Sequence, residues 1–197
     1  MKVSREQVSE NRRRILDAAG RLFRARGFDA VTVSEVMKAA GLTHGAFYGH
    51  FQSKDDLIAQ TLTHVLTHTR TGDGPAAFLD GYLSPDHCAD LAGGCATAGL
   101  GADTIRQSPS ARTAMTAGLR EQLRRMTAHI PGADEDERRR QAIGQWSAMV
   151  GALILARLSD DPALSQEVLG QTRAWIAGTQ AAGAASSDEA ADSTAAG

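Results

Sequence analysis

Apolar residues recur at the three- and four-residue spacing of an α-helix along most of this 197-residue chain, and no stretch alternates as a β-strand would. The first apolar face consists of Ile15, Ala18, Ala19, Leu22 and Phe23. Further helices are predicted over residues 32–41, 43–50, 53–65, 75–83, 91–107, 110–129, 134–158 and 161–176. These patterns predict an all-α fold of about nine helices.

Capping signals set the ends of the first helices. Gly27 is placed to end the first one, and Thr32 and Glu35 have the spacing of a capping box. Gly41 supplies a turn before the next short helix, and Ser53 caps the longer helix that follows. Short helices separated by a tight glycine turn are typical of a helix-turn-helix motif.

Charge is divided unevenly along the chain. Residues 1–61 carry ten Lys and Arg against seven acids, a balance of +3, whereas the remainder carries eleven Arg against sixteen acids, a balance of −5. A basic N-terminal part favours binding of a polyanion by that end alone. Two cysteines make no disulfide framework, and no apolar run approaches the roughly 20 residues of a membrane span, so we expect a reduced cytoplasmic protein without membrane contact.

The second helix of a helix-turn-helix motif enters the major groove, where its first residues meet base edges. Here that helix opens with Thr43, His44 and Gly45. Thr43 and His44 have groups that bond base edges or phosphates, and Gly45 leaves room for close approach. Tyr48, one turn later, is placed to reach phosphate. Two further phosphate contacts are predicted at helix N-termini, from Thr32 and Lys54.

The same segment resembles the DNA-binding domain of TetR-family regulators. The resemblance is carried by Asn11–Ala19, Leu22-Phe23, Gly27-Phe28, Thr32–Val36, Ala39–Leu42 and Gly45–Lys54. Its most specific part is the Tyr-x-His-Phe-x-Ser-Lys run that ends at Lys54. The resemblance implies an all-helical homodimer that reads a palindromic operator with its N-terminal domains and binds an inducer with its C-terminal domains. His50 matches the family pattern, and both packing and DNA contact stay open as its role.

Further along, the chain is similar to one branch of that family. The similarity lies in residues 82–87, 94–100 and 149–157. That branch includes repressors of N-ethylmaleimide-reductase operons, some of which sense electrophiles or oxidants through a cysteine. Cys95 matches its Gly-Cys element, although Ala96 departs from the residue that follows in many relatives. A sensing thiol needs thiolate character and exposure, so redox sensing and simple packing both stay open for Cys95, while Cys88 is expected to be structural.

The C-terminal part contains several candidates for a ligand pocket. Methionine and aromatic side chains adapt to apolar ligands, although each could equally be core. His64 and His68 lie on one helix face but have no third fixed ligand, so no metal site is predicted. The candidates for a pocket or sensor are Cys95, His64, Met115, Trp146 and Met149.

The last two predicted helices contain more apolar side chains than one small layer needs to bury. We therefore expect them to form the dimer surface, as the family resemblance also implies. The predicted interface residues are Val150, Leu153, Ile154, Arg157, Val168 and Trp175. A dimer would hold two recognition helices about 34–36 Å apart, or a multiple of that, which is the spacing of successive major grooves.

These patterns divide the chain into an arm (1–10), a helix-turn-helix domain (11–60), an effector-binding and dimerisation domain (61–177) and a disordered tail (178–197) poor in apolar residues. The predicted function is a DNA-binding transcriptional regulator, a repressor released by a small organic or electrophilic inducer of unknown identity. The alternatives are a thiol-based redox sensor acting through Cys95 and a ligand-free constitutive DNA-binding protein. No catalytic spacing, phosphate loop, metal triad or dinucleotide fingerprint occurs, so neither an enzyme nor a cofactor is expected.

Overall fold

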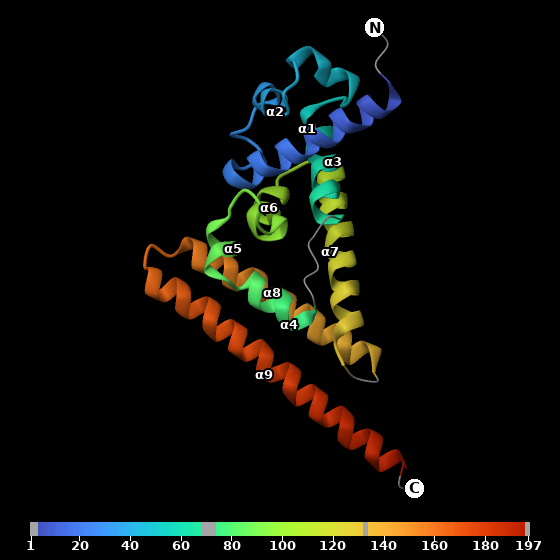
Figure 1. The fold of residues 1–197 in the computed structure, drawn as a ribbon, viewed down its shortest axis with the longest axis vertical. Helices are drawn as coiled ribbons and strands as arrows, with labels where there is room; N and C mark the ends of the chain where they lie inside the picture. The colour runs from blue at the N-terminus through green and yellow to red at the C-terminus, as the bar shows by residue number, and fades with distance from the viewer. Residues whose placement is uncertain (1–3, 68–73, 132–133, 196–197) are drawn as a thin grey trace. The chain divides into compact units, whose positions relative to one another are not determined.

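The computed structural model describes residues 4–67, 74–131 and 134–195, with side chains as far as residue 180. Within these ranges the chain forms nine α-helices, one 3-10 helix and no strand, which confirms the all-α prediction (Figure 1). The elements are α1 (Arg5–Arg26), α2 (Val33–Ala39), η1 (His44–Gly49), α3 (Lys54–Thr67), α4 (Pro75–Tyr82), α5 (Pro85–Ala89), α6 (Ala96–Thr104), α7 (Pro109–His129), α8 (Glu135–Leu158) and α9 (Pro162–Ala195).

The chain divides into two compact units. The first consists of residues 1–69 and 90–119, and the second of residues 70–89 and 120–197. Residues 90–119 therefore belong with the N-terminal helices, although sequence patterns grouped them with the effector domain. Helix α7 contributes its beginning to the first unit and its end to the second.

The predicted helix ends of the first unit are present. The Thr32 hydroxyl accepts a hydrogen bond from the Glu35 amide (3.2 Å), and the Glu35 carboxylate accepts one from the Thr32 amide (2.8 Å), which completes the capping box. The Ser53 hydroxyl accepts from the Asp56 amide at the start of α3 (3.1 Å). Gly27 and Gly41 follow α1 and α2 with φ of 79° and 70°, a backbone conformation that favours glycine.

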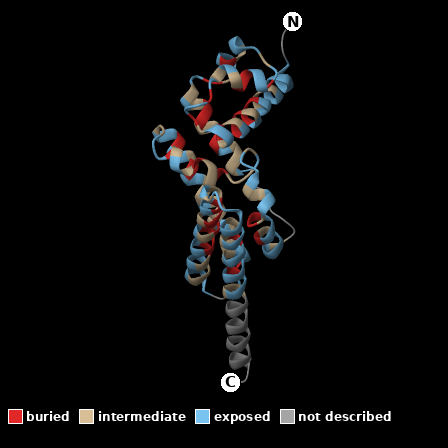
Figure 2. Ribbon diagram, turned by 90° about the vertical axis from the view of Figure 1, so that its left-hand side faces the viewer, coloured by how far each residue is buried: buried red, intermediate tan, exposed pale blue. Residues whose placement is uncertain are grey.

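One apolar core fills the first unit. It is formed by the inner faces of α1, α2, η1 and α3, with residues of α6 and α7 packed against them (Figure 2). Its fully buried side chains include Ile15, Phe23, Phe28, Phe47, Leu57, Leu62 and Leu100. The rings of Phe47 and Phe51 stack with their centres 5.7 Å apart within it, so this aromatic pair attaches η1 to the core.

The second unit is organised around α8 and α9, which lie side by side (Figure 1). The inner faces of the two helices bury Met149, Leu153, Leu169 and Ile176. The Arg157 guanidinium donates to the carbonyls of His87 (3.1 Å) and Cys88 (3.0 Å), and so attaches α5 to α8.

Five features differ from the sequence patterns. Helix α1 begins at Arg5, within the segment expected to be an N-terminal arm (1–10). The segment expected as a helix over 43–50 is a 3-10 helix, α5 was not expected, and the helix expected from residue 91 begins at Ala96. Helix α9 continues to Ala195 through residues expected to be a disordered tail. Alanine has the highest helix propensity of any residue, which accounts for a helix where the apolar content is too low to predict one. Among the described residues, no helix is long and apolar enough to cross a membrane.

Candidate nucleic-acid interface

The first residues of η1 form an exposed ridge on the first unit. Thr43, His44 and Gly45 are all exposed, and Tyr48 is 72 % exposed, whereas Phe47 between them is 1 % exposed. Thr43 stands at the N-cap of η1, yet its side chain makes no capping hydrogen bond there. The ridge therefore presents hydroxyl and imidazole groups outward from a helix fixed by one buried aromatic residue.

Gly45 has no packing role. A Cβ atom built on it would meet no atom within 4 Å, and its φ does not lie in the left-handed region. Neither space nor backbone strain requires a glycine at this position. The predicted close approach of DNA to the backbone at Gly45 stays a prediction.

Arg12 anchors the segment that follows η1. Its guanidinium donates to the carbonyl of His50 (2.7 Å) and to the side chain of Gln60, and lies 4.8 Å from the centre of the Phe51 ring. Arg12 therefore links α1, α3 and the end of η1. Its partners lie 38 to 48 residues away, so no local sequence signal indicates this role.

His50 is half-buried beside this anchor, and its ring lies against Phe51 with centres 6.4 Å apart. Burial lowers the pKa of His50, and the nearby Arg12 charge lowers it further. Both effects favour a neutral ring, which is weaker at attracting phosphate than an imidazolium. These contacts favour the packing role for His50, and its predicted DNA contact stays a prediction.

Thr32 is engaged at the start of α2. Its hydroxyl donates to the Glu35 carboxylate (2.8 Å) while accepting from the Glu35 amide, and Arg26 pairs with the same carboxylate (2.7 Å). These bonds from the Thr32 backbone, Arg26 and the Thr32 hydroxyl lower the pKa of Glu35 to about 2. A phosphate contact by Thr32 would compete with this capping arrangement.

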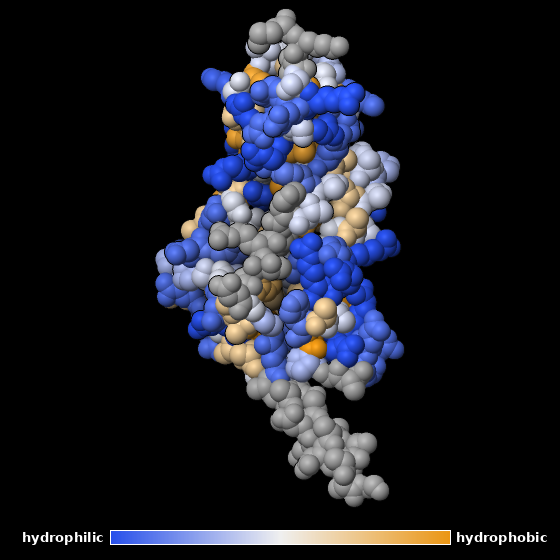
Figure 3. All heavy atoms as spheres, turned by 45° about the vertical axis from the view of Figure 1, so that its right-hand side comes forward, coloured by the Kyte–Doolittle hydropathy of each residue, from blue (hydrophilic) through white to orange (hydrophobic). Residues whose placement is uncertain are grey.

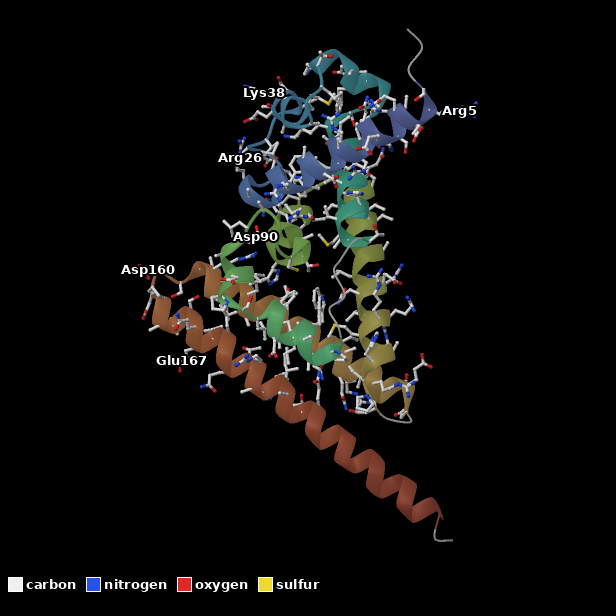
Figure 4. The ribbon with its side chains drawn as sticks, viewed as in Figure 1. Arg5, Arg26, Lys38, Asp90, Asp160 and Glu167 are labelled. Atoms are coloured by element: carbon white, nitrogen blue, oxygen red, sulfur yellow. The ribbon has the colours of Figure 1, made fainter. Side chains whose placement is uncertain are left out.

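Several cations lie on α1, α2 and α3 of the first unit. Lys54 is half-buried at the first position of α3, and Lys38, which sequence reasoning passed over, is exposed on α2. Figure 4 places Arg5 at the start of α1, Arg26 near its other end, and Lys38 on α2. On the face seen in Figure 3, hydrophilic residues dominate the surface of the first unit. Exposed cations beside an exposed polar helix suit a polyanionic ligand.

Three of the predicted sensor residues lie in the first unit. His64 Nε2 lies 2.7 Å from an Asp17 carboxylate oxygen. Cys95 is half-buried at the N-cap of α6, and its Sγ accepts from the Ala98 amide (3.4 Å). Met115 is part of the apolar core.

The second unit contains a cavity of 590 Å³. Of the five predicted pocket residues, only Met149 lines it; Trp146 is buried with its ring 5.4 Å from that of Tyr82. Among the described residues, no three His, Cys, Asp or Glu side chains form a group that could hold a metal ion. His68, one of the two histidines considered for metal binding, lies outside the described residues.

The predicted dimer residues are divided between two environments. Leu153 is fully buried inside the unit, and Arg157 is bonded to α5, so both act within the chain. Trp175 is 56 % exposed and Ile154 is 37 % exposed, while Val150 and Val168 are half-buried. Leu155, Leu158 and Leu164, which were not predicted, are also exposed on the same helix pair.

A short 3-10 helix that follows a glycine turn, carries an exposed polar ridge and is fixed to two flanking helices defines the first unit as a helix-turn-helix domain. Comparison with known proteins agrees. Residues 15–61 match the family model described as "Bacterial regulatory proteins, tetR family". Residues 15–61 of the first unit are therefore similar to the DNA-binding domain of that family.

Similar proteins extend the comparison. The HTH-type transcriptional regulator AcrR of Shigella flexneri is 42 % identical over 57 residues, 29 % of this chain and 26 % of that protein. The HTH-type transcriptional regulator TtgR of Pseudomonas putida is 37 % identical over 85 residues, 43 % of this chain and 40 % of that protein. The matches thus span less than half of these relatives. Both are named as regulators rather than enzymes, in agreement with the prediction from sequence.

Solved structures show the same fold over most of the chain. The reduced form of Escherichia coli NemR superposes with a TM-score of 0.68 at 24 % identity, covering 84 % of this chain and 94 % of that one. A TetR transcriptional regulator from Legionella pneumophila superposes with a TM-score of 0.67 at 20 % identity, covering 91 % and 99 %. The fold of both units is therefore shared with these proteins.

Proposed function

We propose that this chain is a DNA-binding transcriptional regulator whose η1 enters the major groove of an operator. The observation that carries the proposal is the exposed ridge of Thr43, His44, Gly45 and Tyr48 on a helix fixed by Phe47 and Arg12. Thr43 and His44 would bond base edges, while Tyr48, Lys54 and Lys38 would contact phosphates. A protein with this function acts where the chromosome is, in the cytoplasm of a bacterium.

The regulator acts as a homodimer on a palindromic operator. Exposed apolar side chains on α8 and α9 support this part of the proposal, because Ile154, Leu158 and Trp175 would lose contact with water in a dimer. Two-fold symmetry of the protein would match the symmetry of an inverted repeat. Repression is the expected effect, since a bound dimer obstructs transcription.

A small organic inducer controls DNA binding through the second unit. The 590 Å³ cavity supports this, because ligand sites for small molecules have volumes of about 300–1,000 Å³. An inducer shifts DNA affinity only as far as it prefers one conformation of the protein over another.

Thiol sensing through Cys95 is the second candidate, and it follows the similarity to repressors of N-ethylmaleimide-reductase operons. Cys95 is half-buried, so its sulfur is partly accessible to an electrophile or oxidant. If Cys95→Ser still releases DNA fully after oxidant treatment, the thiol is not the switch.

Selection from random double-stranded DNA tests the main proposal. The purified protein should enrich an inverted repeat, and its affinity for that repeat should fall steeply as salt rises. Enrichment of no motif, or affinity that does not depend on sequence, would contradict it.

A further inference from the structure

The cavity of the second unit has a mainly apolar wall. It lies among α4, the end of α7, α8 and α9, and all its lining residues belong to the second unit. Its apolar lining consists of Phe78, Leu79, Met126, Ile130, Met149 and Ile176. Burying the apolar surface of a ligand against such a wall favours binding. The wall alone discriminates little between ligands that carry different functional groups.

Gln145 is the most deeply buried polar residue among the described residues that line the cavity. This glutamine lines the cavity and is 4 % exposed. Its Oε1 accepts a hydrogen bond from Gln180 Nε2 (3.1 Å), which fixes the orientation of the amide. Among the described residues, no group accepts from its Nε2. A buried donor without an acceptor is unfavourable, so a ligand that brings an acceptor is favoured at this position.

The charged groups of the cavity lie nearer to solvent. Arg125 has 27 % of its side chain exposed, and its Nε donates to the Glu121 carboxylate (2.7 Å). His129 is exposed, and its Nδ1–H donates to the Arg125 carbonyl (2.8 Å). An anionic group next to Gln145 would lose its water without gaining a free cation, whereas a neutral oxygen avoids that penalty.

We propose that this cavity binds an uncharged, mainly apolar organic molecule with a hydrogen-bond acceptor, such as a ketone or ester carbonyl, whose oxygen accepts from Gln145 Nε2. This molecule would be the inducer only if the chain is the regulator proposed above, and in that respect the inference rests on the proposed function. Binding itself is a property of the second unit and is measured without DNA.

Competition against a neutral fluorescent ketone tests the proposal on the unaltered protein. The probe is 6-propionyl-2-(dimethylamino)naphthalene, whose emission shifts to the blue in apolar surroundings. Benzophenone should displace it about tenfold more strongly than diphenylmethane, because only benzophenone offers an acceptor and one hydrogen bond accounts for roughly one order of magnitude in affinity. Diphenylacetate, which carries a carboxylate, should compete least.

A variant pair then assigns the effect to one side chain. Gln145→Leu should reduce the preference for benzophenone over diphenylmethane to about one, from roughly one order of magnitude in the unaltered protein. Gln141→Leu is the matched control, because Gln141 is one turn earlier on α8, bonds to Glu137 and does not line the cavity. Circular dichroism establishes that both variants are folded.

Three results would overturn the inference. They are failure of the unaltered protein to bind the neutral probe, equal competition by benzophenone and diphenylmethane, and competition led by diphenylacetate. Since no DNA is present, these outcomes are independent of operator binding. Conversely, if the selection experiment contradicted the DNA-binding proposal, the ligand class found by the competition experiment would still stand.

Discussion

At the scale of single residues, Gly45 is expected to contribute to DNA recognition but not to the stability of the fold. Because a Cβ atom at this position meets no atom within 4 Å, Gly45→Ala should not lower the melting temperature. It should weaken binding to the selected operator about tenfold, since a methyl group would hold the backbone away from the base edges, whose contacts contribute roughly 1–3 kcal/mol each. Circular dichroism and fluorescence anisotropy with labelled DNA measure the two effects.

Gly49→Ala is the control for this prediction. Gly49 is also exposed on η1 with no atom within 4 Å of a Cβ, but it lies at the end of η1 away from Thr43. Its replacement should not lower stability and should leave DNA affinity unchanged. Equal DNA affinity of all three proteins would show that Gly45 does not approach DNA.

The stability of the first unit should depend on pH through the ionisation of Glu35. Its pKa is lowered from 4.5 to about 2 by hydrogen bonds from the Thr32 backbone and the Arg26 side chain. A lowered folded-state pKa stabilises the fold above the unfolded value, and this contribution disappears as pH falls from about 4.5 through about 2.

The matching measurement compares the wild-type protein with Glu35→Gln by thermal melting from pH 7 to pH 2. The wild type should be the more stable at pH 7, and the difference should shrink as pH falls below 4.5. Glu121, whose pKa is also lowered to about 2, titrates equally in both proteins and cancels. A difference independent of pH would mean that the Glu35 charge contributes nothing.

At the scale of elements, Gly118 sets how closely α7 approaches α3. A Cβ atom on Gly118 would lie 2.7 Å from Leu66 Cβ, an atom close to the backbone that cannot swing aside. Gly118→Ala should therefore destabilise the protein by about 1–3 kcal/mol, the usual cost of overpacking. Urea denaturation measures this value.

Gly101→Ala is the paired control. Gly101 lies within α6, and a Cβ atom there meets nothing within 4 Å. Alanine should stabilise the helix by about 0.5–1 kcal/mol, because glycine loses more backbone freedom on folding. If both substitutions stabilised the protein, that result would contradict the close packing of α7 on α3 at Gly118.

Elements with strong local signals could be predicted from the sequence. The capping box at Thr32 and the Ser53 cap both depend on neighbours a few residues away. The 3-10 geometry of η1 could not be predicted, because the same short apolar spacing suits an α-helix. Helix α5 has only five residues and no buried side chain, so it leaves no periodic pattern.

The candidate sites differ in the same way: a site within one short segment could be predicted, and a site built from distant segments could not. The exposed ridge of η1 could be predicted because a short segment fixes its chemistry. The cavity could not, because Phe78, Gln145 and Ile176 come from three helices far apart in sequence. His64 attracted attention by residue type and Cys95 by its match to a Gly-Cys element. Their partners, Asp17 and the Ala98 amide, are known only from the fold.

At the scale of the whole molecule, the exposed apolar side chains of α8 and α9 predict a dimer. Trp175→Glu should convert it to monomers in sedimentation velocity and abolish high-affinity operator binding, because a charge replaces a large apolar contact. Ile105→Glu is the control, since Ile105 is 73 % exposed in the first unit and should leave the dimer intact. Dimers that survive Trp175→Glu would place the interface elsewhere.

The central claim is that η1 reads base sequence, and exchange of its first residue tests this most directly. Random DNA should be selected in parallel with the wild type and with His44→Arg. Arginine favours guanine through two hydrogen bonds, so the variant should enrich an inverted repeat that differs from the wild-type motif at one symmetric position in each half-site, with guanine gained there. Identical motifs from both proteins would contradict the claim that η1 is the recognition helix.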